Sequence, residues 1–206
     1  MLHLSQDTLP EIEYMNSNFS KIQTAIQSLI EMNEQEWKFY SSMFSVKNYP
    51  KKEMLLQPGN ICDHIFFINK GLLRIFFEDK DGNESTFYFS QENDFAVDYE
   101  SFLNRTPSNY SIVAMEDTQV VRMSYKMVID GYKKLRNGEK LGRLLAEKYF
   151  IIFSRKIQNL YTKTPYERYQ LMNTQFPNIR QRVPQHYIAS YLNISSVHLS
   201  RLINKR

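Results

Sequence analysis

The chain has 206 residues and a mass of 24.6 kDa, enough for one large domain or two small ones to bury a core. With 42% hydrophobic and 23% charged residues, its composition excludes an intrinsically disordered protein. The single cysteine excludes an internal disulfide, a cysteine-rich zinc site and a four-cysteine iron–sulfur cluster. The four histidines are too scattered to form a close pair of metal ligands: His3, His64, His186 and His198. We therefore expect no metal, haem or iron–sulfur cofactor.

Charge is distributed unevenly about a net value of +4. Residues 1–125 carry 10 Lys/Arg and 18 Asp/Glu, residues 126–164 carry 10 and 3, and residues 165–206 carry 6 and 1. A basic C-terminal part predicts contact with nucleic acid, because clustered Lys and Arg displace counterions from phosphates. A solvated basic helix would give the same charge pattern, so charge alone does not decide between the two.

Helical spacing of apolar residues predicts helix within residues 17–44. The residues at this spacing are Ile22, Ile26, Leu29 and Ile30. Asn33 followed by Glu36 is typical of a capped helix start and predicts a second, short helix that includes Trp37. The preceding segment, MLHLSQDTLPEIEYMN, is acidic where a signal peptide would be basic, and no apolar run approaches the about 18 residues of a membrane span. We expect a cytoplasmic protein.

The pattern changes to short β-rich runs between Phe44 and Met123. They are VKNY, EMLL, HIFFIN, LLRIFF, STFYF, YSIVAM and QVVRM, and they are separated by the turn signals Pro58-Gly59, Lys70-Gly71 and Asp81-Gly82. Many strands of this length at such spacing predict an antiparallel sandwich, barrel or jelly roll.

One long helix is predicted from about Asn137 to Tyr161. It carries two adjoining apolar stripes: Ala146, Phe150, Phe153, Ile157 and Leu160 on one, and Leu141, Leu145, Tyr149 and Ile152 on the other. One stripe can cover the roll. The other is most simply buried against its own copy, so we expect a two-fold homodimer.

Two further patterns predict a C-terminal helical module. Thr164 before Pro165 is typical of a helix start, and Phe176-Pro177 would end that helix. The segment VPQHYIASYLNISSVHLSRLIN then has the spacing of a helix-turn-helix around the small residue Ala189. The positions expected to be buried are all apolar: Ile188, Leu192, Ile194, Leu199 and Leu202. Pro184 suits the first helix, Asn193 the left-handed turn and Ser195 the cap of the second helix, although a short αα-hairpin of another kind would look similar.

Several separated motifs together resemble the Crp/Fnr family of transcription regulators. The stretch KKEMLLQPGNICDHIFFINKGLLRIFF resembles the opening strands of a cyclic-nucleotide-binding roll, and TPYERY, FP, RQRVPQHYIASYLNIS and LSRL resemble the Bacteroidetes-type subset. The resemblance implies an α+β fold with N-terminal helices, an antiparallel β-roll (jelly roll), a long dimerisation helix and a C-terminal helix-turn-helix. It also implies a homodimer that binds a pseudo-palindromic operator in double-stranded DNA and contacts RNA polymerase.

On this basis the chain divides into four parts. We expect an N-terminal extension (residues 1–20), a sensor roll resembling a cyclic-nucleotide-binding domain (21–134), the dimerisation helix (135–163) and the DNA-binding module (164–206).

The resemblance also assigns roles in DNA binding. Arg201 stands where the family has an arginine that reads guanine, and a guanidinium can donate two hydrogen bonds to that base. The residues expected to set specificity are Ser196, Val197 and His198, and Ser200 is expected to reach phosphate. Further phosphate contacts are assigned to Arg180, Arg182, Lys205 and Arg206. For Arg180 and Arg182, ion pairs with an acidic surface of the roll are an equal alternative.

The effector pocket departs from the family pattern. Cyclic-nucleotide binders have a Gly-Glu pair and, about ten residues later, an Arg followed by Ser or Thr, whereas this chain has Val97-Asp98 and Ser108-Asn109. Asp98 and Glu100 would repel an anion unless Arg105 turned inward. We therefore expect no binding of cyclic AMP or cyclic GMP in the usual way, and either a less anionic ligand or none. Aromatic residues of the roll that would line an apolar pocket, or simply its core, are Phe66, Phe67, Phe76, Phe87, Tyr88, Phe89, Phe95, Tyr99 and Phe102.

Two other functions remain as alternatives. A cupin-like metalloenzyme would need histidines paired across strands, and the roll has only His64. Cys62 beside Asp63 and His64 suggests a thiolate with a base, but neighbouring residues on a strand point to opposite faces. We expect no enzyme. The second alternative is a ligand sensor that acts through protein partners without binding DNA.

Overall fold

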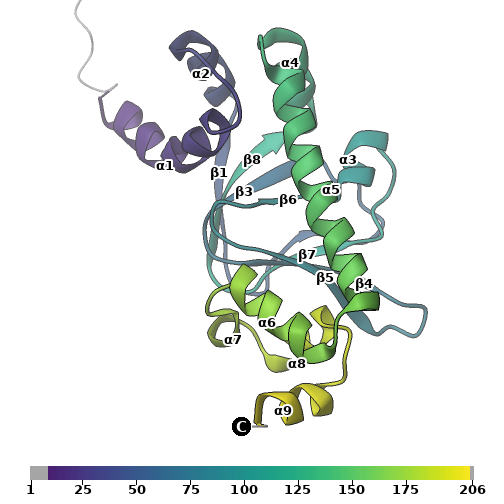
Figure 1. The fold of residues 1–206 in the computed structure, drawn as a ribbon. Coiled ribbons are helices and arrows are strands. Elements are labelled where there is room, and N and C mark those ends of the chain that lie inside the picture. Colours follow the sequence, from purple (N-terminus) through teal and green to yellow (C-terminus); the bar gives the residue numbers. More distant parts are fainter. Residues whose placement is uncertain (1–8, 205–206) are drawn as a thin grey trace, which may run out of the picture.

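A computed structural model describes residues 9–204, with side chains from Asn18 onward. Two four-stranded sheets form a roll, two N-terminal helices cover one end of it, and a long helix runs along it to a helical module at the C-terminus (Figure 1). This arrangement confirms the expected α+β fold. Within the described range, no helix combines the length and apolar character that a membrane span requires.

The N-terminal helices are α1 (Leu9–Gln27) and α2 (Glu34–Ser41). Ile22 and Ile26 of α1 are fully buried. The start of α2 is a capping box, in which the Asn33 side chain accepts from the Glu36 amide at 2.9 Å and the Glu36 carboxylate accepts from the Asn33 amide at 3.1 Å. The predicted second helix is confirmed. The expected boundary between residues 20 and 21 falls inside α1.

All strands of the roll are antiparallel. One sheet has the order β1-β8-β3-β6 and the other β2-β7-β4-β5. The strands are β1 (Ser45–Tyr49), β2 (Met54–Leu56), β3 (His64–Lys70), β4 (Leu73–Glu78), β5 (Glu84–Ser90), β6 (Phe95–Ala96), β7 (Ser111–Ala114) and β8 (Thr118–Ser124). Every predicted β-rich run lies on a strand, and the two-residue β6 was not predicted.

The turn from β3 to β4 needs a glycine. Gly71 has a φ of 103°, and a Cβ there would lie 2.4 Å from the Thr118 hydroxyl oxygen. Only a residue without a side chain fits both the backbone conformation and this close approach. The predicted turn at Lys70-Gly71 is therefore fixed by steric exclusion as well as by backbone preference.

Three helices follow from the roll: α3 (Tyr99–Asn104), α4 (Tyr125–Lys134) and α5 (Gly138–Thr162). The predicted long helix is confirmed, whereas α3 and α4 were not predicted. The Ser124 hydroxyl caps α4 by accepting from the Met127 amide at 3.3 Å. At the start of α5 a Cβ on Gly138 would lie 2.1 Å from the Gly131 carbonyl oxygen, so glycine allows α4 and α5 to meet closely.

The C-terminal module consists of α6 (Pro165–Gln175), α7 (Ile179–Arg182), α8 (Gln185–Tyr191) and α9 (Ser196–Asn204). Thr164 and Glu167 form a capping box at the start of α6, and Phe176 ends that helix, as predicted. The short α7 was not predicted. The buried core of the module includes Met172, Phe176 and Leu199.

Candidate functional site

Helices α8 and α9 have the geometry of a helix-turn-helix. Asn193 in the turn has a φ of 53°, the left-handed conformation expected of it. The Ser195 hydroxyl accepts from the His198 amide at 3.1 Å and caps α9. Of the positions expected to be buried, three are fully buried (Ile188, Leu192 and Leu199) and two are half-buried (Ile194 and Leu202).

The outer face of α9 points away from the rest of the molecule (Figure 1). All five residues assigned to DNA on this helix are exposed: Ser196, Val197, His198, Ser200 and Arg201. The Val197 side chain is 61% exposed, although it is apolar. Among the described residues, none forms an ion pair with Arg201. The face is therefore a surface of small, polar and cationic groups available to another molecule.

Arg182 does not lie on that surface. Its guanidinium binds two carboxylates of the roll, Glu116 at 2.6 Å and Glu92 at 2.9 Å. Arg180, two residues earlier, is exposed, so the two arginines assigned alike by sequence have different surroundings. Lys205, the other expected phosphate contact, lies outside the described residues, as does Arg206.

A buried arginine that sequence reasoning missed joins the roll to the module. Arg74 of β4 is 1% exposed, and its guanidinium lies between the rings of Phe76 at 4.2 Å and Tyr187 of α8 at 3.8 Å. It donates to the Thr86 hydroxyl at 2.8 Å and pairs with Glu84 at 2.5 Å. The available signal was an arginine inside the otherwise apolar run LLRIFF. Through the contact of Arg74 with Tyr187, helix α8 packs directly on the roll.

The free edge of β5 is also covered by helices. The Thr86 amide donates to the Ser190 hydroxyl of α8 at 2.8 Å, and that hydroxyl donates to the Glu84 carbonyl at 3.1 Å. From α5, the Lys156 ammonium donates to the carbonyl of Phe87, and its charge lies 4.3 Å from the centre of the Tyr191 ring. The roll, α5 and the module therefore share one polar contact region at this strand.

The residues at which the resemblance places a cyclic-phosphate site are hydrogen-bonded to one another. The Asp98 carboxylate caps α3, accepting from the Ser101 amide at 3.3 Å and from the Ser108 hydroxyl at 2.6 Å. Both Asp98 and Ser108 are buried, whereas Glu100 and Asn109 are exposed. A helix start favours negative charge, and here the protein supplies that charge itself.

Arg105 is held away from this region. It pairs with Asp63, donates to the Cys62 carbonyl at 3.2 Å and stacks on Tyr125 at 4.4 Å. Arg105 follows the C-terminal end of α3, where Asp63 neutralises its charge, whereas Asp98 lies at the N-terminal end of the same helix. The inward turn that would offset Asp98 and Glu100 is not seen in this conformation.

Cys62 has the surroundings of a structural thiol. Burial raises its pKa to about 11, and the thiol donates to the backbone carbonyl of His64 at 3.4 Å instead of to the imidazole. Across residues 9–204 no three His, Cys, Asp or Glu side chains are grouped to hold a metal ion. The geometry therefore offers no thiolate with a base at this position.

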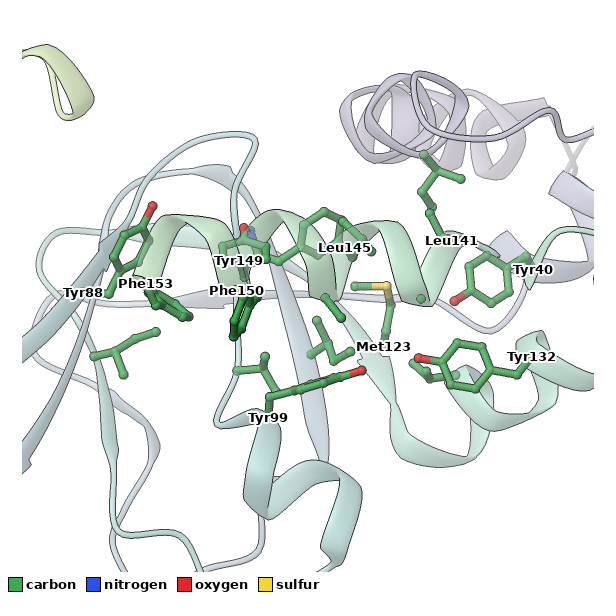
Figure 2. Close-up of a pocket in the computed structure, with 18 residues that line it drawn as sticks. Tyr40, Tyr88, Tyr99, Met123, Tyr132, Leu141, Leu145, Tyr149, Phe150 and Phe153 are labelled. Atoms are coloured by element: carbon green, nitrogen blue, oxygen red, sulfur yellow. Dashed lines mark hydrogen bonds between the residues drawn. The ribbon is translucent and has the colours of Figure 1, made fainter. Parts of the chain in front are cut away.

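A cavity of about 390 Å³ lies between the roll and α5 (Figure 2). Of the expected effector residues, Val97 lines it, together with the expected aromatics Tyr88, Phe95 and Tyr99. Much of its wall comes from residues that sequence reasoning did not assign to a pocket: Ile26, Tyr40, Ile65, Ile75, Met123, Val128, Tyr132, Leu141, Gly142, Leu145, Ala146, Tyr149, Phe150 and Phe153. They were missed because they come from segments far apart in the chain.

Tyrosine hydroxyls are the main polar groups of this cavity. Figure 2 shows the Tyr99 hydroxyl directed towards Tyr132, with Tyr40 beside Tyr132 at the same end. At the other end the Tyr149 hydroxyl accepts from the Phe95 amide at 2.8 Å, which fixes α5 to β6. Burial raises the pKa of Tyr40, Tyr132 and Tyr149, so all three phenols are neutral at physiological pH.

Comparison with known proteins identifies the roll. Residues 46–134 match the model of the cyclic nucleotide-binding domain. The c-di-GMP-responsive global regulator CLP of Xanthomonas campestris shares the fold at 17% identity, with a TM-score of 0.63 and coverage of 82% of this chain and 88% of that chain. FixK2 of Bradyrhizobium japonicum is 16% identical, with a TM-score of 0.66 and coverage of 79% and 83%.

A protein of Eubacterium rectale assigned to the crp/fnr family of transcriptional regulators is also similar. It is 15% identical, with a TM-score of 0.66 and coverage of 84% of this chain and 82% of that chain. No curated protein matches in sequence. The expected fold is confirmed at this level, and the resemblance to the Bacteroidetes-type subset stays a prediction.

Proposed function

We propose that this chain, which has a cyclic nucleotide-binding domain and the fold of Crp/Fnr regulators, is a sequence-specific DNA-binding regulator of transcription. One observation carries the proposal: the outer face of α9 is exposed while Leu199 on its opposite face is fully buried. A helix held in this way by a preceding helix has the form that enters a major groove. The protein is proposed to act in the cytoplasm and to have no catalytic activity.

The roles of individual residues follow from their exposure. Arg201 donates two hydrogen bonds to guanine, and its freedom from ion pairs among the described residues leaves both donors available. The specificity residues are Ser196, Val197 and His198, with Val197 suited to contact the methyl group of thymine. Ser200 and the exposed Arg180 contact phosphates, and we assign the same role to Lys205. Arg182 is proposed to hold the module on the roll instead.

Two copies of the chain are needed for this mode of binding. Exposed apolar side chains of α5 are Phe150, at the border of the cavity, and Ile151 and Ile157, and such apolar area suits a second α5 related by two-fold symmetry. The dimer would bring two α9 helices to half-sites roughly 34 Å apart on a pseudo-palindromic operator. Contact with RNA polymerase would then connect operator binding to transcription.

The roll is proposed to be a sensor that does not bind cyclic AMP or cyclic GMP in the usual way. Support comes from the closed contact between Asp98 and Ser108 and from the pairing of Arg105 with Asp63. A cyclic phosphate brought into the roll would lose its hydration without gaining a cation.

Selection of bound sequences from random DNA tests the proposal. We expect enrichment of a pseudo-palindrome. Arg201→Ala should weaken its binding by roughly 1–3 kcal/mol and relax the preference at one base pair. Arg136→Ala is the control, because Arg136 is exposed near α2, remote from α9. Enrichment of no sequence would overturn the proposal in favour of a sensor acting through protein partners.

A further inference from the structure

We propose that the cavity between the roll and α5 binds an uncharged, largely apolar small molecule with a hydroxyl group at one end. The volume of about 390 Å³ lies within the range of roughly 300–1,000 Å³ that is usual for small-molecule sites. The inference rests on the proposed function only in taking this molecule as the signal that the regulator senses.

The walls of the cavity exclude a charged ligand. None of the described residues that line it is Lys, Arg or His, and opposite walls are formed by apolar side chains such as Ile65, Val97 and Leu145. Behind the wall, Asp94 interacts with Tyr149 and lies 3.9 Å from Lys148, so the charges there are paired with each other. A bound anion would find no cation among the lining side chains, so desolvation would oppose its entry.

The hydroxyl group of the ligand is assigned to the end formed by Tyr40, Tyr99 and Tyr132 (Figure 2). A neutral phenol has one donor and two acceptor lone pairs, so three of them have more acceptors than donors. A ligand hydroxyl can donate to one of the surplus acceptors and also accept. The remaining length of the cavity, towards Phe153 and Tyr88, is apolar and suits a ring or chain.

A ligand in this position would contact the elements that set the position of α5. Tyr40 belongs to α2, Tyr132 to α4, and Leu145 and Ala146 to α5 itself. Filling the space would fix α5 relative to the roll at the helix expected to form the dimer. The cavity is therefore a site through which a small molecule would bias the arrangement of two DNA-binding modules.

Three probes of graded charge test the site by calorimetric titration of the full chain without DNA. They are 2-naphthol, naphthalene-2-carboxylate and cyclic AMP. The first two share a ring system and differ in charge at neutral pH, so their comparison isolates the effect of charge. We expect 2-naphthol to bind at least tenfold more tightly than either anion. Equal or tighter binding of naphthalene-2-carboxylate or cyclic AMP would overturn the proposal.

Variants locate the binding. Ala146→Leu fills the cavity from α5 and should reduce 2-naphthol affinity at least tenfold, whereas Ser154→Leu on an exposed part of the same helix should not. Val97→Leu fills it from the roll and serves if Ala146→Leu does not fold. Tyr132→Phe should weaken 2-naphthol by about 3–10-fold and leave naphthalene unchanged, since one hydrogen bond is lost. Unchanged 2-naphthol binding in a folded cavity-filling variant would place the probe elsewhere and end the proposal.

The result of this binding test is independent of the result of the DNA-selection experiment. Because the titration contains no DNA, the cavity can bind 2-naphthol in a protein that selects no operator. Conversely, a protein that selects an operator but binds no uncharged probe would retain its function in DNA binding and lose only this site.

Discussion

At the residue scale, Arg180 and Arg182 show how far local surroundings change the role of a charge. They are separated by one residue, yet Arg180 is exposed and Arg182 is held by Glu92 and Glu116. Sequence places both in the same basic segment and cannot distinguish them. The carboxylates that bind Arg182 are more than 60 residues away in the chain, so only the folded structure brings them together.

The two arginines should therefore differ in the salt dependence of operator binding. A phosphate contact releases counterions, so Arg180→Gln should weaken binding and lower the slope of log K against log salt by about 1. Arg182→Gln should leave that slope unchanged, because its charge is already neutralised within the protein. Titration of labelled operator at several salt concentrations measures both slopes. A loss of slope in Arg182→Gln matching that of Arg180→Gln would show that Arg182 leaves the roll when DNA binds.

Lys156 is a second residue whose surroundings determine its chemistry. Burial lowers its pKa to about 8, from 10.5 for the unperturbed side chain. Between these values the unfolded chain binds more protons than the native chain, so this residue makes the free energy of unfolding rise with pH. Below about pH 8 both states are protonated and the native state carries the full cost of a buried charge.

Lys156→Met should remove this dependence. The free energy of unfolding of the parent minus that of the variant should increase by about 1–3 kcal/mol as pH rises from 8 to 10.5. Denaturant unfolding at a series of pH values gives the difference directly and cancels the titration of Cys62 and the tyrosines. Lys140→Met, at an exposed position of the same helix, should show a difference that is flat with pH. A flat difference for Lys156→Met as well would show that the pKa of Lys156 is not lowered in the native state.

At the element scale, α5 divides its apolar residues differently from the two stripes expected. Phe153 belongs to the face that covers the roll, with its ring centre 4.7 Å from that of Phe87 and 5.3 Å from that of Tyr88. Leu145 is half-buried on the same side. Phe150 borders the cavity but is 73% exposed, and Ile157, which does not line the cavity, is 54% exposed. A charge at Leu145 or Phe153 would therefore test folding of the roll more than dimer formation.

Substitution on the exposed face of α5 tests the dimer. Ile151→Glu and Ile157→Glu should each give folded monomers, because burying a carboxylate in an apolar interface is unfavourable. Light scattering at micromolar concentration measures the mass, and operator binding should be lost in parallel. Lys140→Glu controls for the added negative charge. A stable monomer of the unmodified chain would contradict the two-fold mode of binding.

Elements with a long or repeated pattern were the ones predictable from sequence. The long helix, the capped starts at Asn33 and Thr164 and the seven main β-rich runs all appear in the structure. The elements not predicted are short, like β6 with two residues and α7 with four, or begin where a strand ends, like α4 after Ser124. Over so few residues, the intrinsic preference for helix or strand is too weak to fix the secondary structure, which depends instead on contacts with the rest of the fold.

The candidate sites also differ in how far they could be predicted from the sequence. The recognition face of α9 lies within one continuous segment, so the helix-turn-helix spacing and the family resemblance were enough to assign Arg201, which is exposed in the structure. The cavity draws Ile26, Met123 and Leu145 from three separate regions, and Arg74 meets Tyr187 across more than 100 residues. No local pattern encodes such meetings. They depend on the packing of the whole chain.

At the scale of the whole molecule, α5 is in contact with both the roll and the C-terminal module. Its first half borders the cavity, Tyr149 fixes it to β6, and Lys156 joins it to β5 and to Tyr191 of the module. The module is held on the roll separately, through Arg182 and Arg74. A change at the cavity can therefore reach α9 by way of α5 only if the contacts of the module with the roll also rearrange.

The covering of β5 by α5 and α8 also affects how readily the protein aggregates. If α5 and the module move away from the roll, the Thr86 amide loses its partner Ser190 and the Phe87 carbonyl loses its partner Lys156. An unprotected strand edge can add a strand from another molecule and so begin a growing aggregate. The contact that is proposed to position the DNA-binding helices thus also prevents the sheets of two molecules from pairing at this edge. Weakening it would make the module more mobile and would make the protein aggregate faster in concentrated solution.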